Sequence, residues 1–185
     1  MAHLRPARVH ILRLVSWKAA IGWALAFLVV GVVGARGLFH GHSSNELRET
    51  RLTGRVTRIV DGDTIEVRLH DRTETVRYIG VDTPESVKPG VPVQCFAKQA
   101  SAFNHRLVAG RSVRLRLGPE HRDRYGRLLA YVFLEGGKAV FVNAALVRRG
   151  YARTLAIAPN TRLATRFDRL ERAAMRRGRG LWRRC

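Results

Sequence analysis

The chain has 185 residues and a strongly basic composition, with 34 Lys plus Arg against 14 Asp plus Glu and a formal net charge of +20. Its length and its 46% of apolar residues allow one sizeable core and argue against two full domains. A charge of this sign predicts an extended, negatively charged partner such as DNA or RNA, although an anionic membrane surface would satisfy it equally well.

The N-terminal region combines basic residues with an apolar segment. Residues 1–18 are basic, and residues 19–35 form an uncharged run of 17 residues. This length lies between the apolar core of a signal peptide and a membrane span of about 20 residues. Three alternatives stay open: an uncleaved membrane anchor, a signal cleaved after the small residues that end the run, and a buried core helix. The first two send the following domain out of the cytoplasm, either anchored to the membrane or secreted or periplasmic, because the basic flank stays inside.

The composition changes after the apolar run. Residues 36–51 are rich in Gly, His, Ser and Asn and show no sustained period, which is typical of a flexible linker. His40 and His42 lie in this stretch and are expected to be solvated spacer residues, not metal ligands. The globular domain is then expected to occupy residues 52–185.

Short strands dominate the first part of this domain. Apolar and polar residues alternate over 65–69 and 113–117, which is the period of a half-buried strand. Residues 53–60 and 75–81 are rich in β-forming residues, and 127–134 is almost continuously apolar, as in a more buried strand. Five strands of this size could close a small barrel, with mostly local pairing.

Helices are expected between and after the strands. Two segments carry apolar residues at the spacing of one helix face: Phe96, Ala100, Phe103 and Leu107, followed by Gly110, and Leu163, Phe167, Leu170 and Ala174. A third, short helix is expected over residues 143–149. The predicted fold class is therefore α+β, a barrel of strands with helices packed outside.

Acidic residues cluster in three motifs despite the basic background. The motifs are Asp61-Gly62-Asp63-Thr64, Asp82-Thr83-Pro84-Glu85 and Asp123-Arg124-Tyr125-Gly126-Arg127, and together they hold five of the fourteen acids. The first two follow predicted strands. Carboxylates from two loops, a backbone carbonyl and water are the hard oxygen ligands that Ca²⁺ or Mg²⁺ requires. Taken singly, each motif is better explained by turn chemistry, because Asp-Gly and Thr-Pro are frequent where strands end.

Two arginines near these acids in the sequence indicate a chemical role for the acidic motifs. Arg77 lies five residues before Asp82, and Arg127 opens the apolar strand directly after the third motif. A guanidinium presents a planar fork of donors to phosphate oxygens, and two of them beside a metal can stabilise a five-coordinate phosphorus. The combination predicts phosphoryl chemistry on a nucleic acid.

The ordered motifs resemble those of the thermonuclease, or micrococcal nuclease, family. They are the segments 59–64, 77–85, 123–127 and 142–150, with a closing Gly-Leu-Trp at 180–182. The resemblance covers roughly residues 52–182. It implies an OB-type five-stranded β-barrel with three helices. It also implies Ca²⁺-dependent hydrolysis of phosphodiester bonds in DNA and RNA, with little sequence preference and with 3′-phosphate ends as products.

The resemblance implies roles for the residues of the first two motifs. One Ca²⁺ ion would be held by Asp63, Asp82 and the main-chain carbonyl of Thr83. Glu85 would orient or deprotonate the attacking water. Asp61 would shape the site without binding the metal directly.

The resemblance also implies roles on the phosphate side of the site. Arg77 and Arg127 would be catalytic and would clamp the reacting phosphate. Arg124 and Tyr125 would contact a terminal phosphate of the bound nucleotide, and Asp123 would support their loop. The expected partners are DNA and RNA, single-stranded or as a frayed duplex, and the membrane if the N-terminal segment is not cleaved. No protein partner is implied.

The chain departs from the family pattern in one loop. Residues 154–158 contain no aromatic side chain, whereas better-known members carry tyrosines before the last helix. Stacking on a base contributes about 1 to 3 kcal/mol. Nucleotide binding in this part of the cleft is therefore expected to be weaker or arranged differently.

The two cysteines bear on the compartment in which the protein works. Cys95 opens the first long helix, and Cys185 ends the chain. In an exported protein an isolated pair tends to be oxidised. We expect a disulfide between them, with two unpaired thiols as the alternative.

Two rival functions remain at this stage. One is a non-catalytic nucleic-acid-binding module built on the same barrel, which would usually lose the acids and arginines that this chain retains. The other is a membrane-bound basic protein whose charge serves anionic lipid. That second rival gives no account of Asp63, Asp82 and Glu85.

Overall fold

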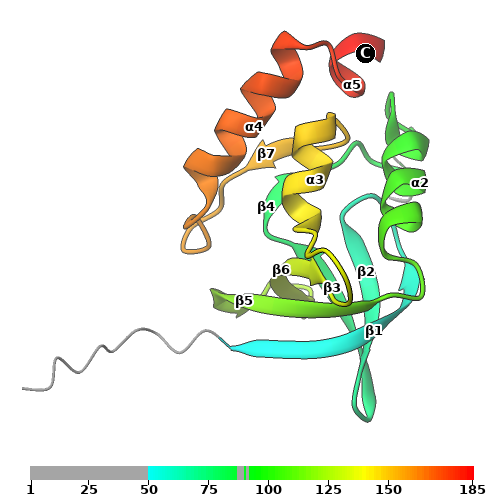
Figure 1. Cartoon of the computed structure of the whole chain (residues 1–185), viewed down its shortest axis with the longest axis vertical. Helices are drawn as coiled ribbons and strands as arrows, with labels where there is room; N and C mark the ends of the chain where they lie inside the picture. Colours follow the sequence, from blue (N-terminus) through cyan, green and yellow to red (C-terminus); the bar gives the residue numbers. More distant parts are fainter. Residues whose placement is uncertain (1–49, 87–89, 91) are drawn as a thin grey trace, which may run out of the picture. The chain divides into compact units, whose positions relative to one another are not determined.

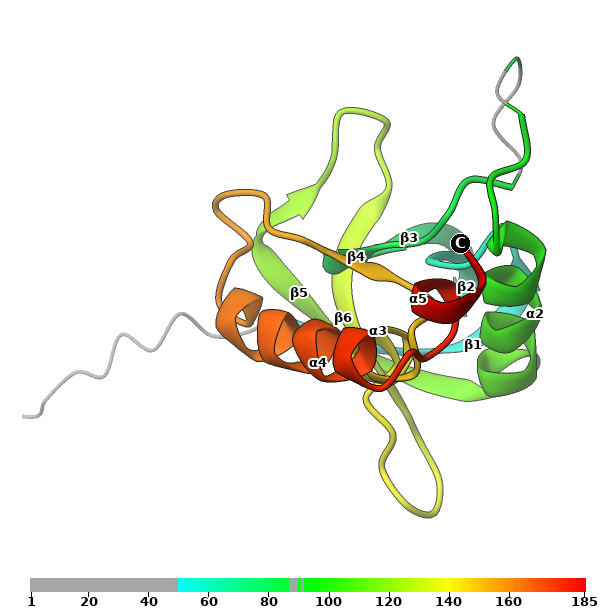
Figure 2. The ribbon, with the colours of Figure 1, turned by 90° about the horizontal axis from the view of Figure 1, so that it is seen from above.

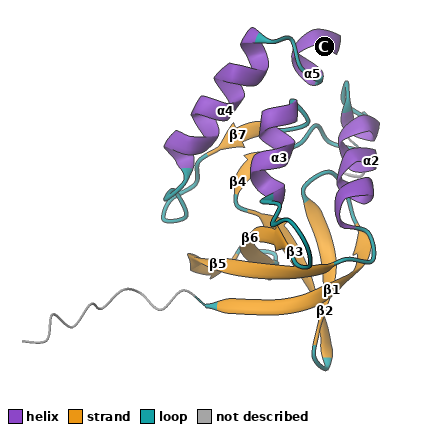
Figure 3. Cartoon of the chain, viewed as in Figure 1, coloured by secondary structure: helices purple, strands orange, loops and turns teal. Residues whose placement is uncertain are grey.

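Five β-strands close into a barrel in the computed structural model, with the helices gathered at one side of it (Figures 1 and 3). The strands are β1 (Arg51–Ile59), β2 (Thr64–Leu69), β3 (Arg72–Tyr78), β5 (Ser112–Arg122) and β6 (Leu128–Leu134). Around the barrel they run in the order β1, β2, β3, β6, β5. The predicted α+β class and the five-stranded barrel are confirmed.

The structure describes residues 50–86, 90 and 92–185, all within one unit that spans Glu46–Cys185. The predicted membrane or signal helix over 19–35 lies outside these residues, as do the basic region 1–18 and nearly all of the linker 36–51. Within the described residues, no helix has both the length and the apolarity that a membrane crossing requires.

Alternating side chains fill the inside of the barrel. In β2, Ile65, Val67 and Leu69 are buried, whereas Arg68 between them is exposed. The pattern arises because successive side chains of a strand point to opposite faces of the sheet. Strand β5 repeats it with three more buried residues, Val113, Leu115 and Leu117. Burial of each such side chain contributes about 1.5 to 3 kcal/mol, so the barrel interior is the main source of stability.

The three predicted helices are present. They are α2 (Ala97–Val108), α3 (Val142–Arg149) and α4 (Ala164–Arg176). Helix α3 packs between the other two, as Figure 1 shows, and Figure 2 gives the same layer from above. A fourth helix, α5 (Leu181–Arg184), was not predicted, because four residues are too few to show a helical period.

Two pairings between distant strands close the barrel. Strand β1 pairs antiparallel with β5, so that Leu52 lies opposite Leu115. Strand β3 pairs in parallel with β6, so that Arg77 lies opposite Leu129. The predicted local pairing holds for β1 with β2, β2 with β3, and β5 with β6. Pairing between strands that follow one another in the chain would leave the barrel open. The sequence pattern did not indicate the parallel pair of β3 and β6.

A small two-stranded sheet lies beside the barrel and carries the second acidic motif. It consists of β4 (Gly80–Asp82) and β7 (Arg153–Leu155), which pair antiparallel. Asp82 lies opposite Arg153 at one end of this sheet. Strand β7 is only three residues long and was not predicted from the sequence.

The prediction of one continuous strand over residues 75–81 is wrong, because a turn at Ile79 separates β3 from β4, which begins at Gly80. This glycine has a φ of +79°, in the left-handed region where a side chain is strained. A Cβ atom built there would also lie 2.4 Å from the ring of Phe167. Helix α4 therefore packs directly on the backbone at the break, and the residues after it join the small sheet instead of the barrel.

A disulfide joins Cys95, just before α2, to Cys185 at the end of the chain. Their Cα atoms are 6.0 Å apart. Aromatic contacts hold the same helix to the segment after α3: the rings of Phe96 and Phe103 stack on Tyr151 at centroid distances of 5.3 and 4.2 Å. The C-terminus, the start of α2 and the end of α3 are therefore linked to one another.

A buried asparagine connects α3 to the barrel. The side-chain oxygen of Asn143 accepts a hydrogen bond from the amide of Val132 at 2.9 Å. Its nitrogen donates to the carbonyl of Ile79 at 2.9 Å and to that of Ala130 at 3.3 Å. These bonds fall where the chain leaves β3, so Asn143 satisfies backbone groups beside the strand break.

We expect Asn143→Ala to lower the free energy of unfolding by about 3 kcal/mol, since it leaves a buried N–H and a buried carbonyl without their partner. Urea denaturation of the purified protein measures this, with the exposed helix position Gln99→Ala as a control. A loss below about 1 kcal/mol would show that water or a shifted neighbour replaces the side chain.

Candidate active site

A buried carboxylate organises the candidate site. Asp63 is 4% exposed and lies at the end of the loop between β1 and β2. Its Oδ2 accepts hydrogen bonds from the amide of Thr83 at 2.7 Å and from Thr83 Oγ1 at 2.9 Å. Its Oδ1 accepts from Thr64 Oγ1 at 3.2 Å. A Cβ atom at Gly62 would lie 2.6 Å from Thr83 Oγ1, so the glycine permits this close contact between the two acidic motifs.

One arginine bridges the two aspartates that were predicted to bind metal. Arg77 lies on β3, and its side chain is 15% exposed. Its Nη1 lies 2.7 Å from Asp63 Oδ1 and donates to the carbonyl of Val81 at 3.0 Å, while Nη2 donates to Asp82 Oδ1 at 2.9 Å. A single guanidinium thus contacts the carboxylates of both motifs. The Asp82 side chain is 53% exposed and faces solvent.

Asp61 shapes the loop that presents Asp63. Its Oδ1 accepts a hydrogen bond from the amide of Asp63 at 2.9 Å, and its carbonyl accepts from Asn104 Nδ2 at 3.0 Å. Asn104 in turn accepts a hydrogen bond from the Tyr78 hydroxyl at 3.0 Å. Burial, and then the negative charge of Asp63, raise the pKa of Asp61 to about 6.

Glu85 lies two residues beyond Thr83, and both its backbone N–H and its backbone carbonyl are hydrogen-bonded. Its amide donates to Gln94 Oε1 at 2.9 Å, and its carbonyl accepts from the amide of Gln94 at 2.9 Å. The Glu85 side chain accepts a hydrogen bond from the amide of Ser86 at 2.8 Å. The predicted catalytic carboxylate therefore stands on a segment that is fastened near the start of α2.

The loop between β5 and β6 forms around Asp123. Its Oδ1 accepts hydrogen bonds from the amides of Tyr125 at 2.9 Å and Arg127 at 3.0 Å. Its Oδ2 lies 2.7 Å from both Nε and Nη2 of Arg127. Burial opposes ionisation of Asp123, but the hydrogen bonds from Arg127 and the loop amides outweigh it and hold the pKa of Asp123 below its usual value.

An aromatic ring stands exposed on this loop between two positive charges. Tyr125 is 68% exposed. The guanidinium carbons of Arg124 and Arg127 lie 4.9 and 5.4 Å from its ring centroid, and Arg124 Nη2 donates to its hydroxyl at 2.8 Å. An exposed ring flanked by guanidinium groups can meet either a base or a phosphate.

The parallel pairing of β3 and β6 brings the two predicted catalytic arginines to neighbouring strands. Arg77 lies opposite Leu129, two residues beyond Arg127. Arg127 lies in the loop between β5 and β6, directly before the first residue of β6. The loop that carries Arg127 therefore enters β6 at the edge of the barrel where β3 ends.

The oxygen donors at this edge suit a hard cation. Asp63 and Asp82 supply carboxylates, and backbone carbonyls such as that of Thr83, together with water, are the usual remaining ligands of Ca²⁺. Over residues 50–86, 90 and 92–185, no group of three or more His, Cys, Asp or Glu side chains comes together to hold a metal. A cation here would thus depend on two carboxylates and on main-chain and solvent oxygens.

Comparison with known proteins agrees with this geometry. A family model described as staphylococcal nuclease homologue matches residues 75–184. The chain belongs to the staphylococcal nuclease family.

Several curated members of the staphylococcal nuclease family are similar to this chain over most of its length. The thermonuclease of Staphylococcus hyicus is 42% identical over 130 residues, which cover 70% of this chain and 75% of that protein. The thermonuclease of Staphylococcus intermedius is 37% identical over 161 residues, covering 87% and 92%. Endonuclease YncB of Bacillus subtilis is 37% identical over 143 residues, covering 76% and 65%.

In this member of the staphylococcal nuclease family, the predicted site residues form two groups with direct contacts. The first group is Asp61, Asp63, Arg77, Asp82 and Thr83. The second group is Asp123, Arg124, Tyr125 and Arg127. Glu85 follows the first group along the chain. The contacts are observed, whereas the catalytic and metal-binding roles of these residues stay predictions.

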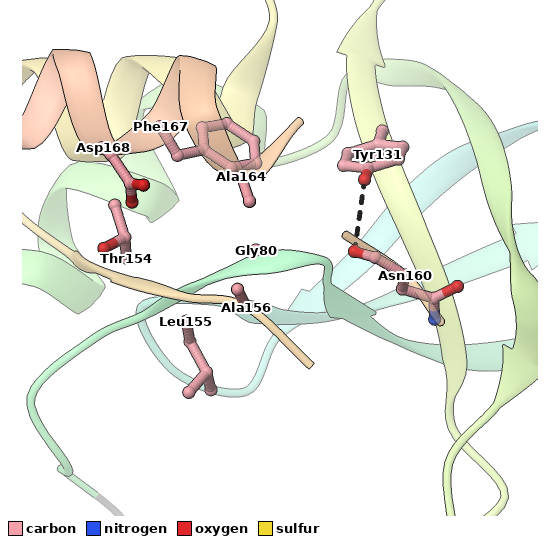
Figure 4. Close-up of a pocket in the computed structure, with 9 residues that line it drawn as sticks. All are labelled: Gly80, Tyr131, Thr154, Leu155, Ala156, Asn160, Ala164, Phe167 and Asp168. Carbon is pink, nitrogen blue, oxygen red and sulfur yellow. Dashed lines mark hydrogen bonds between the residues drawn. The ribbon is translucent and has the colours of Figure 1, made fainter. Parts of the chain in front are cut away.

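The loop that lacks the family's tyrosines lines only a small hollow. Its volume is about 10 Å³, and its walls come from β4, β6, β7, α4 and the loop between β7 and α4 (Figure 4). In Figure 4, Leu155 and Ala156 lie beside Gly80, and the hydroxyl of Tyr131 donates to the carbonyl of Asn160 at 3.5 Å. Such a volume holds about one water molecule and no base.

Sequence reasoning missed two polar residues that hold the site. Asn104 shares the buried side of α2 with Ala97, Ala100 and Val108. A polar residue at such a position is a signal, because it must find buried partners. Gln94 gave no comparable signal, since its partner Glu85 is set by the path of the intervening chain.

The acid sensitivity of Asp123 can be tested. Its folded-state pKa lies below the value of about 3.9 of an unfolded aspartate, so its ionised form stabilises the fold fully above about pH 4, and this stabilisation is lost as the pH falls through the folded value. We expect Asp123→Asn to weaken the acid dependence of the free energy of unfolding, as measured by urea denaturation between about pH 2 and pH 6. Equal pH profiles for the two proteins would contradict the assignment.

Proposed function

We propose that this chain is a Ca²⁺-dependent nuclease that cuts DNA and RNA with little sequence preference and leaves 3′-phosphate ends. The coarser statement, that it is a nuclease and hydrolyses phosphodiester bonds, follows from its family and from relatives named thermonuclease and endonuclease. The metal, the products and the range of substrates are proposals.

One observation supports the proposal above all others. The guanidinium of Arg77 contacts the carboxylates of Asp63 and Asp82 at 2.7 and 2.9 Å. This arrangement holds negative charge for a cation and positive charge for a phosphate at one place. A structural ion pair would need one carboxylate. Phosphoryl transfer needs negative groups that hold a cation and positive groups that bind the phosphate at the same place.

Asp63, Asp82 and the carbonyl of Thr83 are the proposed metal ligands. Bound Ca²⁺ would supply positive charge that polarises a non-bridging oxygen of the reacting phosphate. The role of the three residues is to present oxygens at a fixed spacing, and the hydrogen bonds that Thr83 makes to Asp63 hold two of them together. Asp82, being open to solvent, would stand nearest to the substrate.

Glu85 is the proposed catalytic carboxylate. It orients a water molecule or takes its proton, so that the water oxygen attacks phosphorus and the bond to the 5′ oxygen breaks. The 5′ oxygen leaves with the bonding pair and is protonated from solvent, while the phosphate stays on the 3′ side. The hydrogen bond from Ser86 fixes one oxygen of Glu85 during this step.

Arg77 and Arg127 are proposed to stabilise the extra charge of the five-coordinate phosphorus. Asp123 holds Nε and Nη2 of Arg127, so Nη1 is the nitrogen that would meet a phosphate oxygen. Arg124 and Tyr125 on the same loop would contact a terminal phosphate or the adjoining nucleotide. With no aromatic side chain in the loop 154–158, we expect this pair to contribute more to nucleotide binding.

We also propose that the domain works outside the cytoplasm, either anchored through residues 19–35 or released after their removal. The basic flank and apolar run support this proposal. The Cys95–Cys185 disulfide supports it too, since such bonds persist in oxidising compartments.

Metal dependence is tested with the full chain purified in detergent. We expect cleavage of plasmid DNA and of RNA in Ca²⁺, complete loss of cleavage with a chelator, and recovery when Ca²⁺ is added back. A mobility shift without cutting in either condition would instead identify a non-catalytic binding module. Cutting that persists in chelator would rule out the metal proposal.

The arginine roles are tested by single substitutions. Removal of one transition-state donor costs about 10²- to 10³-fold in rate, so we expect Arg77→Ala and Arg127→Ala each to lower kcat by that factor. Initial rates on a fluorescent oligonucleotide measure the loss. Arg172→Ala, an exposed position on α4, is the matched control and should cut normally. Wild-type rates in either site variant would refute its assigned role.

A further inference from the structure

We propose that Gln94 is a positioning residue for Glu85 and that the Cys95–Cys185 disulfide keeps Gln94 in place, so that the nuclease is fully active only when this disulfide is oxidised. The proposal rests on the catalytic role of Glu85 given above. Its residues lie at the start of α2 and at the C-terminus, outside the metal and phosphate positions.

Gln94 holds the backbone of Glu85 from both sides. Its side-chain oxygen accepts the Glu85 amide at 2.9 Å, and its own amide donates to the Glu85 carbonyl at 2.9 Å. The carbonyl of Gln94 accepts a hydrogen bond from Ala97 at 3.1 Å, at the beginning of α2. Gln94 therefore fastens the catalytic segment to the end of a helix through three polar groups.

The orientation of the Glu85 carboxylate depends on this backbone. The side chain accepts a hydrogen bond from the next amide, that of Ser86, at 2.8 Å. A change in the peptide plane there moves the donor and the carboxylate with it. Because a displacement of about 1 Å can cost about a hundredfold in rate, the reaction should be sensitive to the Gln94 contacts.

The disulfide connects the residue next to Gln94 to the C-terminal end of the chain. Cys95 is the next residue after Gln94, and its partner Cys185 follows α5. The amide of Leu181 at the start of α5 donates to the carbonyl of Gly150 at 2.9 Å, directly after α3. Leu181 is itself buried. The disulfide thus fixes the residue beside Gln94 to a part of the chain that is packed on α3.

A cavity beside the catalytic segment explains why covalent support matters. It has a volume of about 170 Å³, with Asp82, Thr83 and Pro84 on one side and Gln94, Cys95 and Cys185 among its other lining residues. Close packing contributes little where a cavity lies between two segments. Hydrogen bonds to Gln94 and the disulfide next to it therefore supply the constraint that side-chain packing would supply elsewhere.

Reduction removes the covalent part of this support. A dithiol reductant gives two electrons and two protons to the disulfide, yields the thiols of Cys95 and Cys185, and is itself oxidised to a disulfide. Cys95 and Cys185 are then no longer covalently joined, and Gln94 keeps only its hydrogen bonds. A reducing compartment would therefore hold the nuclease at low activity, and an oxidising one would switch it on.

The role of Gln94 is tested with three variants of the full chain in its oxidised form. Gln94→Met keeps the length of the side chain and removes the acceptor, whereas Gln94→Glu keeps an acceptor oxygen. Gln99→Met, exposed on the same helix, is the control. We expect Gln94→Met to lower kcat about tenfold at unchanged KM, the effect of one hydrogen bond, with Gln94→Glu recovering most of the loss. Hydrogen exchange of the Glu85 amide should quicken in Gln94→Met alone.

An unchanged kcat in Gln94→Met, or equal losses in the Met and Glu variants, would overturn the positioning role. An unchanged exchange rate of the Glu85 amide would do the same, because a purely structural effect elsewhere would not reach that single amide.

The disulfide is tested by reducing the wild type with dithiothreitol and by the double variant Cys95→Ser, Cys185→Ser. Both are assayed at a temperature at which circular dichroism shows a folded protein. We expect each to lower kcat at least as much as Gln94→Met while KM holds, and reoxidation of the wild type to restore the rate. Equal kcat for oxidised and reduced protein would overturn the redox dependence.

The two proposals fail in different ways. If oxidised wild type in Ca²⁺ does not cut nucleic acid, the proposed function fails. If it cuts, and the Gln94 and cysteine variants cut at the same rate, only the positioning role fails.

Discussion

A buried carboxylate in a chain of net charge +20 needs donors around it, and Asp63 is the point at which the site is assembled. It accepts from Thr64, from both the amide and the hydroxyl of Thr83, and from Arg77. Its own carbonyl accepts the amide of Tyr78. A single side chain thereby joins β2, β3 and the segment after β4. Asp82 is joined to this junction through Arg77.

Carboxylates also restrain two of the many arginines. Arg77 is held through Nη1 and Nη2 by Asp63 and Asp82, and Arg127 through Nε and Nη2 by Asp123, so the orientation of each guanidinium is fixed. An arginine on an exposed helix face has no such restraint and pays side-chain entropy on meeting a phosphate. Acids placed against a basic background thus create order among the cations.

Most strands and helices, and the motifs of the candidate site, could be predicted from local sequence patterns. The remaining features depend on contacts between residues distant in the chain. Alternation in β2 and β5 and the spacing of α2 and α4 indicated the barrel and its helices, since each pattern records which face is buried. The break beside Gly80 is packed against the ring of Phe167, and Gln94 contacts Glu85 nine residues earlier in the chain. Motifs indicated which acids and arginines matter but not that Arg77 bridges two carboxylates. The apolar segment 19–35 stays a prediction.

The parallel pairing of β3 with β6 has a consequence for the order in which the protein matures. It joins Val76 to Leu128, while the other closing pair joins Arg51 to Arg116. Contacts between such distant positions form late, because the entropy of closing the intervening chain must be overcome first. Arg77 and Arg127 are therefore apart in a nascent or partly folded chain. The phosphate side of the proposed site is therefore complete only once the barrel has closed.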